Sequence, residues 1–177
     1  PVDHLNAGPV VAKWIRSLKM ANRVFVSPDV GNVKRAQIYA NMLGGEICII
    51  DKRRKSATKI ESKAIIGDVE GKNVLMVDDM ITTAGTVVEA MKILKEHGVK
   101  DIYVAATHAV FAPPAMERLA DAPFTQLAIT DTIPLGTRAD AIKGRLVQLS
   151  VANLLGSAIE RIHYNRSVSE LLTESPE

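Results

Sequence analysis

Two adjacent carboxylates, Asp78 and Asp79, are followed closely by a turn of hydroxyl and small residues at positions 82–86. Residues 74–77 are apolar and predict a buried strand, and residues 87–91 predict the start of a helix. In open α/β sheets, ligands bind just outside the carboxyl ends of strands. Free backbone N–H groups at a helix N-terminus favour a phosphate there. Because carboxylates repel a phosphate unless they face sugar hydroxyls or a divalent cation, the pattern predicts a sugar phosphate bound together with a metal.

The turn that would hold the phosphate offers backbone N–H groups and three hydroxyls. Its residues are Thr82, Thr83, Ala84, Gly85 and Thr86. Such residues often do no more than cap a helix, and a short motif is weak evidence without its context. Here a strand, an acidic pair, a turn and a helix follow one another, which is the context that the chemistry requires.

This segment resembles the loop for phosphoribosyl diphosphate (PRPP) that type I phosphoribosyltransferases and PRPP synthetases share. Further segments resemble the synthetases in particular, including a second acidic loop and a basic catalytic loop. The matching segments are residues 26–31, 51–54, 65–72, 106–108, 130–134, 161–163 and 167–169. The resemblance to PRPP synthetase, or ribose-phosphate diphosphokinase, covers essentially the whole chain and roughly the C-terminal half of that enzyme.

The resemblance implies transfer of a diphosphoryl group from ATP to the C1 hydroxyl of ribose 5-phosphate, which gives PRPP and AMP. Residues 82–86 would hold the 5-phosphate. Asp78 and Asp79 would accept hydrogen bonds from the ribose 2- and 3-hydroxyls, directly or through Mg²⁺ and its waters. The family usually carries Asp where this chain has Thr82. A hydroxyl cannot act as a carboxylate base, so activity would rest on positioning and on cations, which dominate phosphoryl transfer.

The resemblance also implies a metal ligand and a catalytic loop. Asp29 would bind Mg²⁺, for which one carboxylate is adequate because Mg²⁺ keeps waters and substrate phosphates. The alternative for Asp29 is a turn without a ligand. Lys52 and Arg54 would neutralise oxygens of the transferring group, with Arg53 as a weaker candidate. The alternative for residues 52–59 is an exposed, mobile and merely solvated loop.

Ser167, Ser169 and Asp3 resemble positions that hold a regulatory phosphate or nucleotide phosphate at a subunit interface of a homo-oligomer. Their alternative is a turn with local hydroxyl contacts. Lys34 and Arg35 are better explained as a solvated helix face than as phosphate ligands.

Apolar strands alternate with amphipathic helices along the chain, which predicts an α/β fold with a mostly parallel sheet covered by helices on both faces. The resemblance makes this fold phosphoribosyltransferase-like, and the length favours a single domain over residues 1–177. We expect helices at residues 8–20, 33–43, 87–97 and 151–163, with a short helix after Pro113 and Pro114. We expect strands at residues 23–27, 46–51, 63–67, 73–78, 101–107, 125–130 and 146–149.

The composition excludes several classes. With 22 basic and 20 acidic residues the net charge is +2, too balanced for a nucleic-acid partner. No apolar run approaches the roughly 20 residues that span a bilayer, and no signal peptide opens the chain. The single Cys48 lies in an apolar strand and suggests core packing and a reducing cytoplasm. Four scattered histidines form no zinc spacing.

The chain begins without methionine, where the family sequence is already in mid-course. We therefore expect a C-terminal domain that lacks the ATP pocket and is inactive without the N-terminal half. Two alternatives remain. A type I phosphoribosyltransferase would need a hood for the nucleobase, which no segment supplies. A synthetase-associated regulatory subunit without chemistry should have lost the basic loop or the Thr/Gly turn, and both are present.

Overall fold

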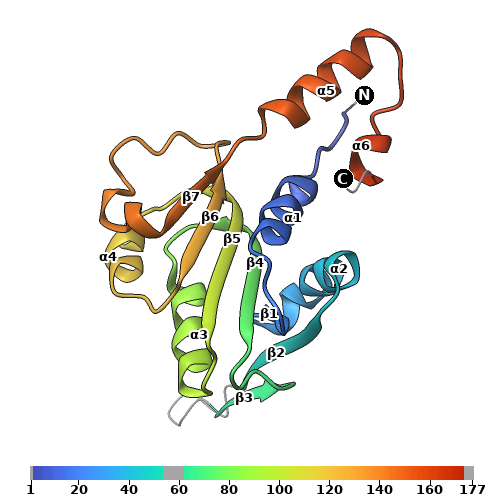
Figure 1. The fold of residues 1–177 in the computed structure, drawn as a ribbon. Helices are drawn as coiled ribbons and strands as arrows, with labels where there is room; N and C mark the ends of the chain where they lie inside the picture. The colour runs from blue at the N-terminus through green and yellow to red at the C-terminus, as the bar shows by residue number, and fades with distance from the viewer. Residues whose placement is uncertain (1, 54–61, 174–177) are drawn as a thin grey trace.

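One twisted sheet forms the body of the protein in the computed structural model, which describes residues 2–53 and 62–173. Its strands lie in the order β3-β2-β1-β4-β5-β6-β7 (Figure 1). All neighbouring strands are parallel except β2 and β3. The strands are β1 (Arg23–Ser27), β2 (Glu46–Arg53), β3 (Ser62–Ile66), β4 (Asn73–Ile81), β5 (Asp101–Ala109), β6 (Gln126–Thr130) and β7 (Leu146–Leu149). The predicted α/β fold with a mostly parallel sheet is confirmed.

Helices cover both faces of this sheet (Figure 1). The α-helices are α1 (Gly8–Ser17), α2 (Val33–Leu43), α3 (Gly85–Glu96), α4 (Ala115–Ala120), α5 (Ala152–His163) and α6 (Glu170–Thr173). Two short 3₁₀ helices, η1 (Val30–Asn32) and η2 (Asp140–Arg145), lie in the connections. Helix α6 and both 3₁₀ helices were not predicted from the sequence.

Two apolar clusters pack on the opposite faces, because successive strand residues point to alternate sides. On the face of α1 and α2, Trp14 and Ile15 belong to the same cluster as Phe25 of β1 and Leu75 of β4. On the other face, Met91 and the rest of the apolar side of α3 pack with strand residues of opposite parity. Full burial of one such side chain stabilises the fold by about 1.5–3 kcal/mol.

The central strands β1 and β4 lie side by side at the point where the strand order reverses. The chain after β1 leads toward β2 and β3, and the chain after β4 leads toward β5, so the two connections diverge. A crevice at the carboxyl ends of the strands is expected at such a switch point. The fold therefore places η1 and the turn after β4 next to each other.

Three strands, β2, β4 and β5, extend further than predicted, and the differences in β2 and β4 affect the site. Strand β4 continues to Ile81, because Met80 and Ile81 pair with His108 and Ala109 of β5. The acidic pair thus lies inside the strand and not at its end as predicted. Strand β2 continues to Arg53, so the prediction that a loop begins at Lys52 is wrong.

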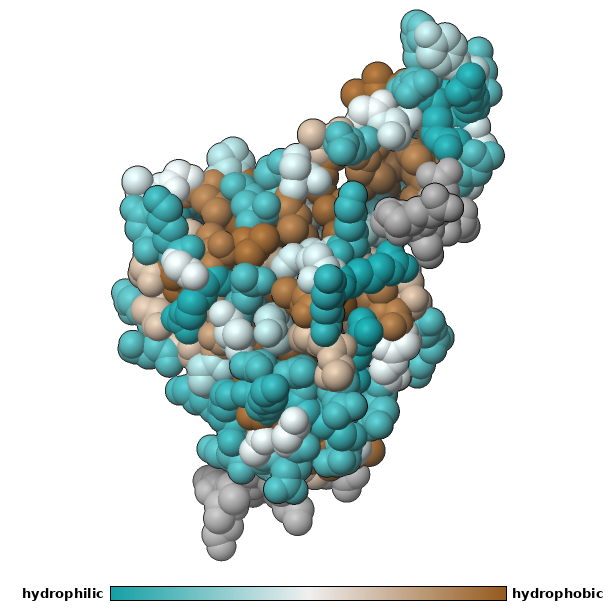
Figure 2. Space-filling model, in the orientation of Figure 1, coloured by the Kyte–Doolittle hydropathy of each residue, from teal (hydrophilic) through white to brown (hydrophobic). Residues whose placement is uncertain are grey.

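Helix α5 projects away from the body of the molecule (Figure 1). Of its residues only Ala158 is buried, whereas Leu155, Ile159 and Ile162 are exposed. Apolar surface is visible along this projecting part in the space-filling view (Figure 2). Among the described residues, no helix is both long and apolar enough to cross a membrane.

Candidate active site

The turn between β4 and α3 has an unusual backbone that leaves a helix N-terminus open. Ala84 is in the left-handed region (φ 58°) and precedes α3 without forming a side-chain cap. The first helical hydrogen bond is donated by the Val88 N–H to the Ala84 carbonyl at 3.0 Å. The earlier N–H groups of α3 have no partner within the helix and are available to an anion. Arg118 of α4 braces the turn by donating to the Thr83 carbonyl at 2.9 Å.

A depression of about 230 Å³ lies beside this turn and is lined by Asp29, Asp78, Met80 and residues 81–87. The structure therefore brings together the whole predicted phosphate turn, one member of the acidic pair and the candidate metal ligand. Thr82, Thr83 and Thr86 are exposed there, whereas the Ala84 side chain is buried. The methyl group of Ala84 thus contributes to packing, and the ligand-facing groups of the turn are its backbone and hydroxyls.

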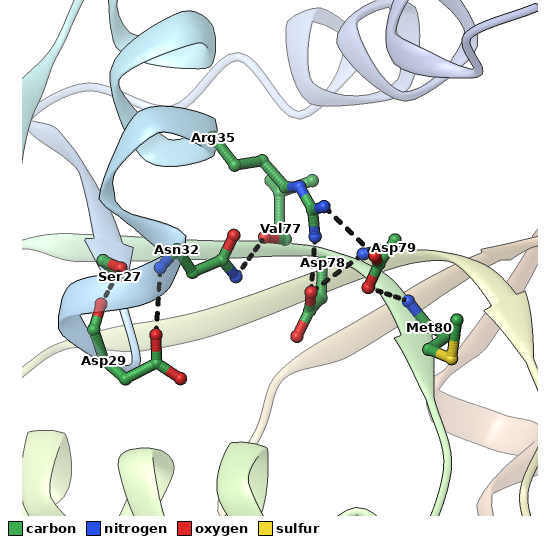
Figure 3. Close-up of polar contacts among 8 residues, drawn as sticks. All are labelled: Ser27, Asp29, Asn32, Arg35, Val77, Asp78, Asp79 and Met80. Carbon is green, nitrogen blue, oxygen red and sulfur yellow. Dashed lines mark hydrogen bonds and ion pairs between the residues drawn. The ribbon is translucent and has the colours of Figure 1, made fainter. Parts of the chain in front are cut away.

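The two carboxylates share one arginine (Figure 3). Arg35 Nη1 lies 2.5 Å from Asp78 Oδ1, and Nη2 lies 3.3 Å from Asp79 Oδ2. Arg35 comes from the first turn of α2. The interpretation of Arg35 as part of a solvated helix face is wrong, because 32% of its side chain is exposed and its guanidinium is paired. Lys34, its neighbour, is exposed as predicted.

Backbone N–H groups also hold the acidic pair in place, and the pKa values of its two carboxyl groups are shifted in opposite directions. Asp78 Oδ1 also accepts from the Asp79 N–H at 2.9 Å, and Asp79 Oδ1 accepts from the Met80 N–H at 2.8 Å. Burial raises the pKa of Asp78, despite the opposing charge of Arg35. The hydrogen bond from Arg35 lowers the pKa of Asp79.

The carboxylates also differ in the surfaces that they reach. Asp78 lines the depression beside the turn and a second one of about 460 Å³, whose walls include Arg35, Tyr39 and Thr107. Asp79 lines only the second depression of these two. Asp78 is therefore the member of the pair that can contact a ligand whose phosphate lies on the turn.

Asp29 begins η1 and is fixed by its own loop (Figure 3). Its Oδ1 accepts from the Asn32 N–H at 2.9 Å, and its carbonyl accepts from the Ser27 hydroxyl at 2.5 Å. The Asn32 side chain in turn donates to the Val77 carbonyl of β4 at 3.4 Å. These local contacts agree with the alternative interpretation of Asp29 as a turn residue, and no contact within the described residues involves its second carboxylate oxygen.

The positions of the two predicted catalytic side chains, those of Lys52 and Arg54, are not described by the structure. Lys52 lies near the end of β2, but its side chain is outside the described part of the structure. Arg54 lies outside the described residues altogether. Their catalytic roles therefore stay predictions.

The predicted regulatory residues Ser167, Ser169 and Asp3 are not among the residues that line the depression beside the turn. Ser167 and Ser169 follow the projecting helix α5, and the Ser169 N–H donates to the Ser167 hydroxyl at 3.2 Å. This contact is the local turn of the alternative interpretation. Asp3 is exposed in the segment before α1. A phosphate site at these residues stays a prediction.

Sequence reasoning did not find the contributions of Arg35 and Arg118. Both side chains reach across from helices that are distant in sequence from residues 78–86. The order of the strands is needed to see that α2 and α4 flank the turn. One signal was present for Arg35, namely a cation in the first turn of the helix that follows an acidic loop.

Comparisons with known proteins identify the family of this chain. A family model described as the phosphoribosyl synthetase-associated domain matches residues 59–173. The ribose-phosphate pyrophosphokinase of Rhodopirellula baltica is 48% identical over 98% of this chain and 55% of its own length. That of Gloeobacter violaceus is 45% identical over 97% of this chain and 51% of its own length. The chain spans about half the length of these curated relatives.

Solved structures give the same result. Phosphoribosylpyrophosphate synthetase from Mycobacterium smegmatis superposes with a TM-score of 0.83 and 36% identity, covering 93% of this chain and 53% of that one. The APRTase from Giardia lamblia, with a TM-score of 0.51 and 20% identity over 67% of this chain and 73% of its own, shows a similar fold alone. From the family match and these likenesses together, the chain belongs to the phosphoribosyl synthetase-associated domain family.

Proposed function

We propose that this chain is the part of a ribose-phosphate diphosphokinase that binds ribose 5-phosphate. The observation that carries the proposal is the depression in which Asp29, Asp78 and the uncapped start of α3 line one surface. The N–H groups and hydroxyls of the turn suit a phosphate. Carboxylate oxygens suit sugar hydroxyls, which are hydrogen-bond donors. The curated relatives named ribose-phosphate pyrophosphokinase support the same activity.

In the proposed reaction the C1 hydroxyl oxygen of ribose 5-phosphate attacks the β-phosphorus of ATP. The bond from that phosphorus to the oxygen bridging the α-phosphate breaks, the hydroxyl loses its proton, and AMP leaves. Residues 82–86 would fix the sugar by its 5-phosphate, and Asp78 would orient its hydroxyls. Such positioning converts a bimolecular encounter into a reaction of aligned groups. Lys52 and Arg54 would act on the transferring group, as the resemblance implies.

The residues near η1 fit Mg²⁺. Asp29 is exposed and keeps one carboxylate oxygen outside its capping contact. A single carboxylate is adequate for Mg²⁺, because this ion often binds one or two carboxylates and otherwise waters and phosphates. Bound there, Mg²⁺ would neutralise charge on the diphosphoryl group. Asp29 would hold it, and the Asn32 N–H keeps the Asp29 carboxylate oriented.

The test is binding of ribose 5-phosphate to the purified chain by calorimetry. Thr86→Val should weaken binding by about ten- to a hundredfold, the effect of losing a hydrogen bond to a charged group. Thr137→Val is the matched control, because Thr137 is also exposed but lies outside the lining of the depression. Ribose without phosphate should show no difference between the proteins. Equal binding of ribose 5-phosphate by wild type and Thr86→Val would remove the turn from the site.

A further inference from the structure

The proposed site places negative charges next to a ligand that is itself anionic. Asp29 and Asp78 line the depression, and Asp79 follows directly in the strand. A sugar phosphate that approached the turn would meet this charge at short range. Repulsion between unit charges falls off slowly within a partly desolvated surface. The site therefore needs a compensating positive charge that belongs to the protein or arrives with a metal.

Arg35 occupies the place where such a charge is most effective (Figure 3). Its guanidinium contacts both carboxylates of the pair through different nitrogen atoms. Helix α2 is anchored on the sheet by buried Ala36, Tyr39 and Ala40, which fixes the point from which Arg35 reaches β4. Arginine is suited to this role because it stays charged and presents several donors in one plane.

The contacts also decide which carboxylate atoms stay free. Asp78 Oδ1 accepts from Arg35 and from the Asp79 N–H. Both oxygens of Asp79 have donors, Met80 N–H for Oδ1 and Arg35 for Oδ2. Among the described residues, no donor contacts Asp78 Oδ2. In Figure 3 this oxygen points away from the guanidinium, so Arg35 leaves it available to a ligand.

We infer that Arg35 is the positioning residue of the acidic pair: it fixes both carboxylates and supplies the built-in positive charge that allows an anionic sugar phosphate to bind beside them. The inference rests on the proposed function and adds a residue and a charge balance to it. It also separates Arg35 from Lys34, which lines the same larger depression but pairs with neither carboxylate.

The experiment measures the Kd of ribose 5-phosphate by calorimetry in the presence of EDTA, so that only charges of the protein act. Arg35→Met removes the charge but keeps most of the side-chain length. Lys34→Met is the matched control. Arg35→Lys keeps the charge with a single nitrogen. Asp79→Asn, alone and combined with Arg35→Met, removes one negative charge while an oxygen acceptor stays in place.

Arg35→Met should weaken binding on the order of tenfold or more, equivalent to at least about 1.4 kcal/mol. Lys34→Met should change it less than threefold, about 0.65 kcal/mol, and Arg35→Lys should fall between the two. The Arg35→Met/Asp79→Asn protein should bind more tightly than Arg35→Met alone, because removal of a negative charge compensates for the lost positive one. A purely structural role of Arg35 predicts no such recovery.

Two results would overturn the inference while leaving the proposed function intact: wild-type affinity in Arg35→Met, or a double variant that binds no better than Arg35→Met. If the wild-type chain itself bound no ribose 5-phosphate, the proposed function would fail and the inference with it. Circular dichroism of each variant shows whether a loss of binding follows from unfolding. If Arg35→Met is unfolded, Arg35→Lys and Asp79→Asn are the informative variants. Wild-type affinity of Arg35→Lys would then contradict the inference that Arg35 must hold the two carboxylates through two different nitrogen atoms.

Discussion

Ala84 occupies the left-handed backbone region between two exposed threonines and the first turn of α3. This conformation costs a non-glycine residue roughly 1–2 kcal/mol. It directs the chain from the edge of the sheet into the helix so that the N–H groups of α3 face the depression. The buried methyl group of Ala84 offsets part of that cost by packing in the core. The turn thus combines a strained backbone with a buried apolar side chain.

Ala84→Gly should consequently change the stability of the fold by less than about 1 kcal/mol, because relief of the left-handed conformation balances the lost methyl group. Ala90→Gly is the matched control, since Ala90 is equally buried but lies in the interior of α3. It should cost about 1.5–2 kcal/mol, from helix propensity and burial together. Urea unfolding of both variants measures the difference. Equal losses would mean that the Ala84 backbone carries no strain.

At this scale the sequence predicted the groups that are adjacent along the chain and missed those that meet through the fold. Residues 82–86 and Asp78 could be predicted to lie together, as they do in the lining of one depression, because strand, turn and helix are consecutive. The inequality of Asp78 and Asp79 could not be predicted, since it depends on the helix that packs beside each side chain. Arg35 was missed for the same reason: its charge pattern on α2 is also that of a solvated face.

Among the elements, the prediction from the sequence was exact for two strands and one helix. The bounds of β1, α2 and β7 agree with the prediction residue for residue. The predicted ranges of β2 and β4 ended too early, at Asp51 and Asp78, although the backbones of both strands go on pairing with β3 and β5. Ladder hydrogen bonds depend on the backbone, so a polar side chain at an exposed strand end does not stop the strand.

The single cysteine of the chain lies in β2, so its reactivity can be used to test whether this strand is buried. Cys48 is fully buried, and burial raises the pKa of its thiol from 9.0 to about 11. At pH 8 the native protein should therefore react with a thiol reagent at least about a hundredfold more slowly than the unfolded chain, because only the thiolate is nucleophilic. Absorbance with Ellman's reagent in buffer and in urea measures both rates.

The raised pKa of Cys48 also makes the stability of the fold depend on pH. The folded state holds the Cys48 proton more tightly than the unfolded state, so this stabilisation is complete below pH 9 and is lost as the pH rises toward 11. In Cys48→Ala, the free energy of unfolding should therefore decrease less between pH 9 and pH 11 than in wild type. Rapid labelling of native wild type at pH 8 would contradict the buried position of β2.

At the scale of the whole molecule, the sheet is a rigid support and α5 is an extension from it. The described body buries apolar side chains on both faces of the sheet, and the candidate site lies at the carboxyl ends of its central strands β1 and β4. Helix α5 contributes one buried residue, Ala158, and exposes large apolar side chains along its length. The sequence pattern predicted helix α5 well. It could not show that the apolar side of α5 is exposed, because that depends on where the helix lies relative to the body of the protein.

The difference in packing predicts a difference in hydrogen exchange. An isolated helix of about 12 residues is marginal in water, so the amides of α5 should exchange near the rate of a weakly protected segment. Amides of β4 and β5, in the middle of the sheet, should exchange only through global unfolding. Mass spectrometry of deuterated peptides compares the two regions in one sample, with α3 as a control for a helix of the same length that is packed on the sheet. If the amides of α5 were as protected as those of α3, α5 could not be an uncovered helix in solution. Dilution of the sample would then show whether contact with a second copy of the chain protects α5, since such protection decreases as the protein concentration is lowered.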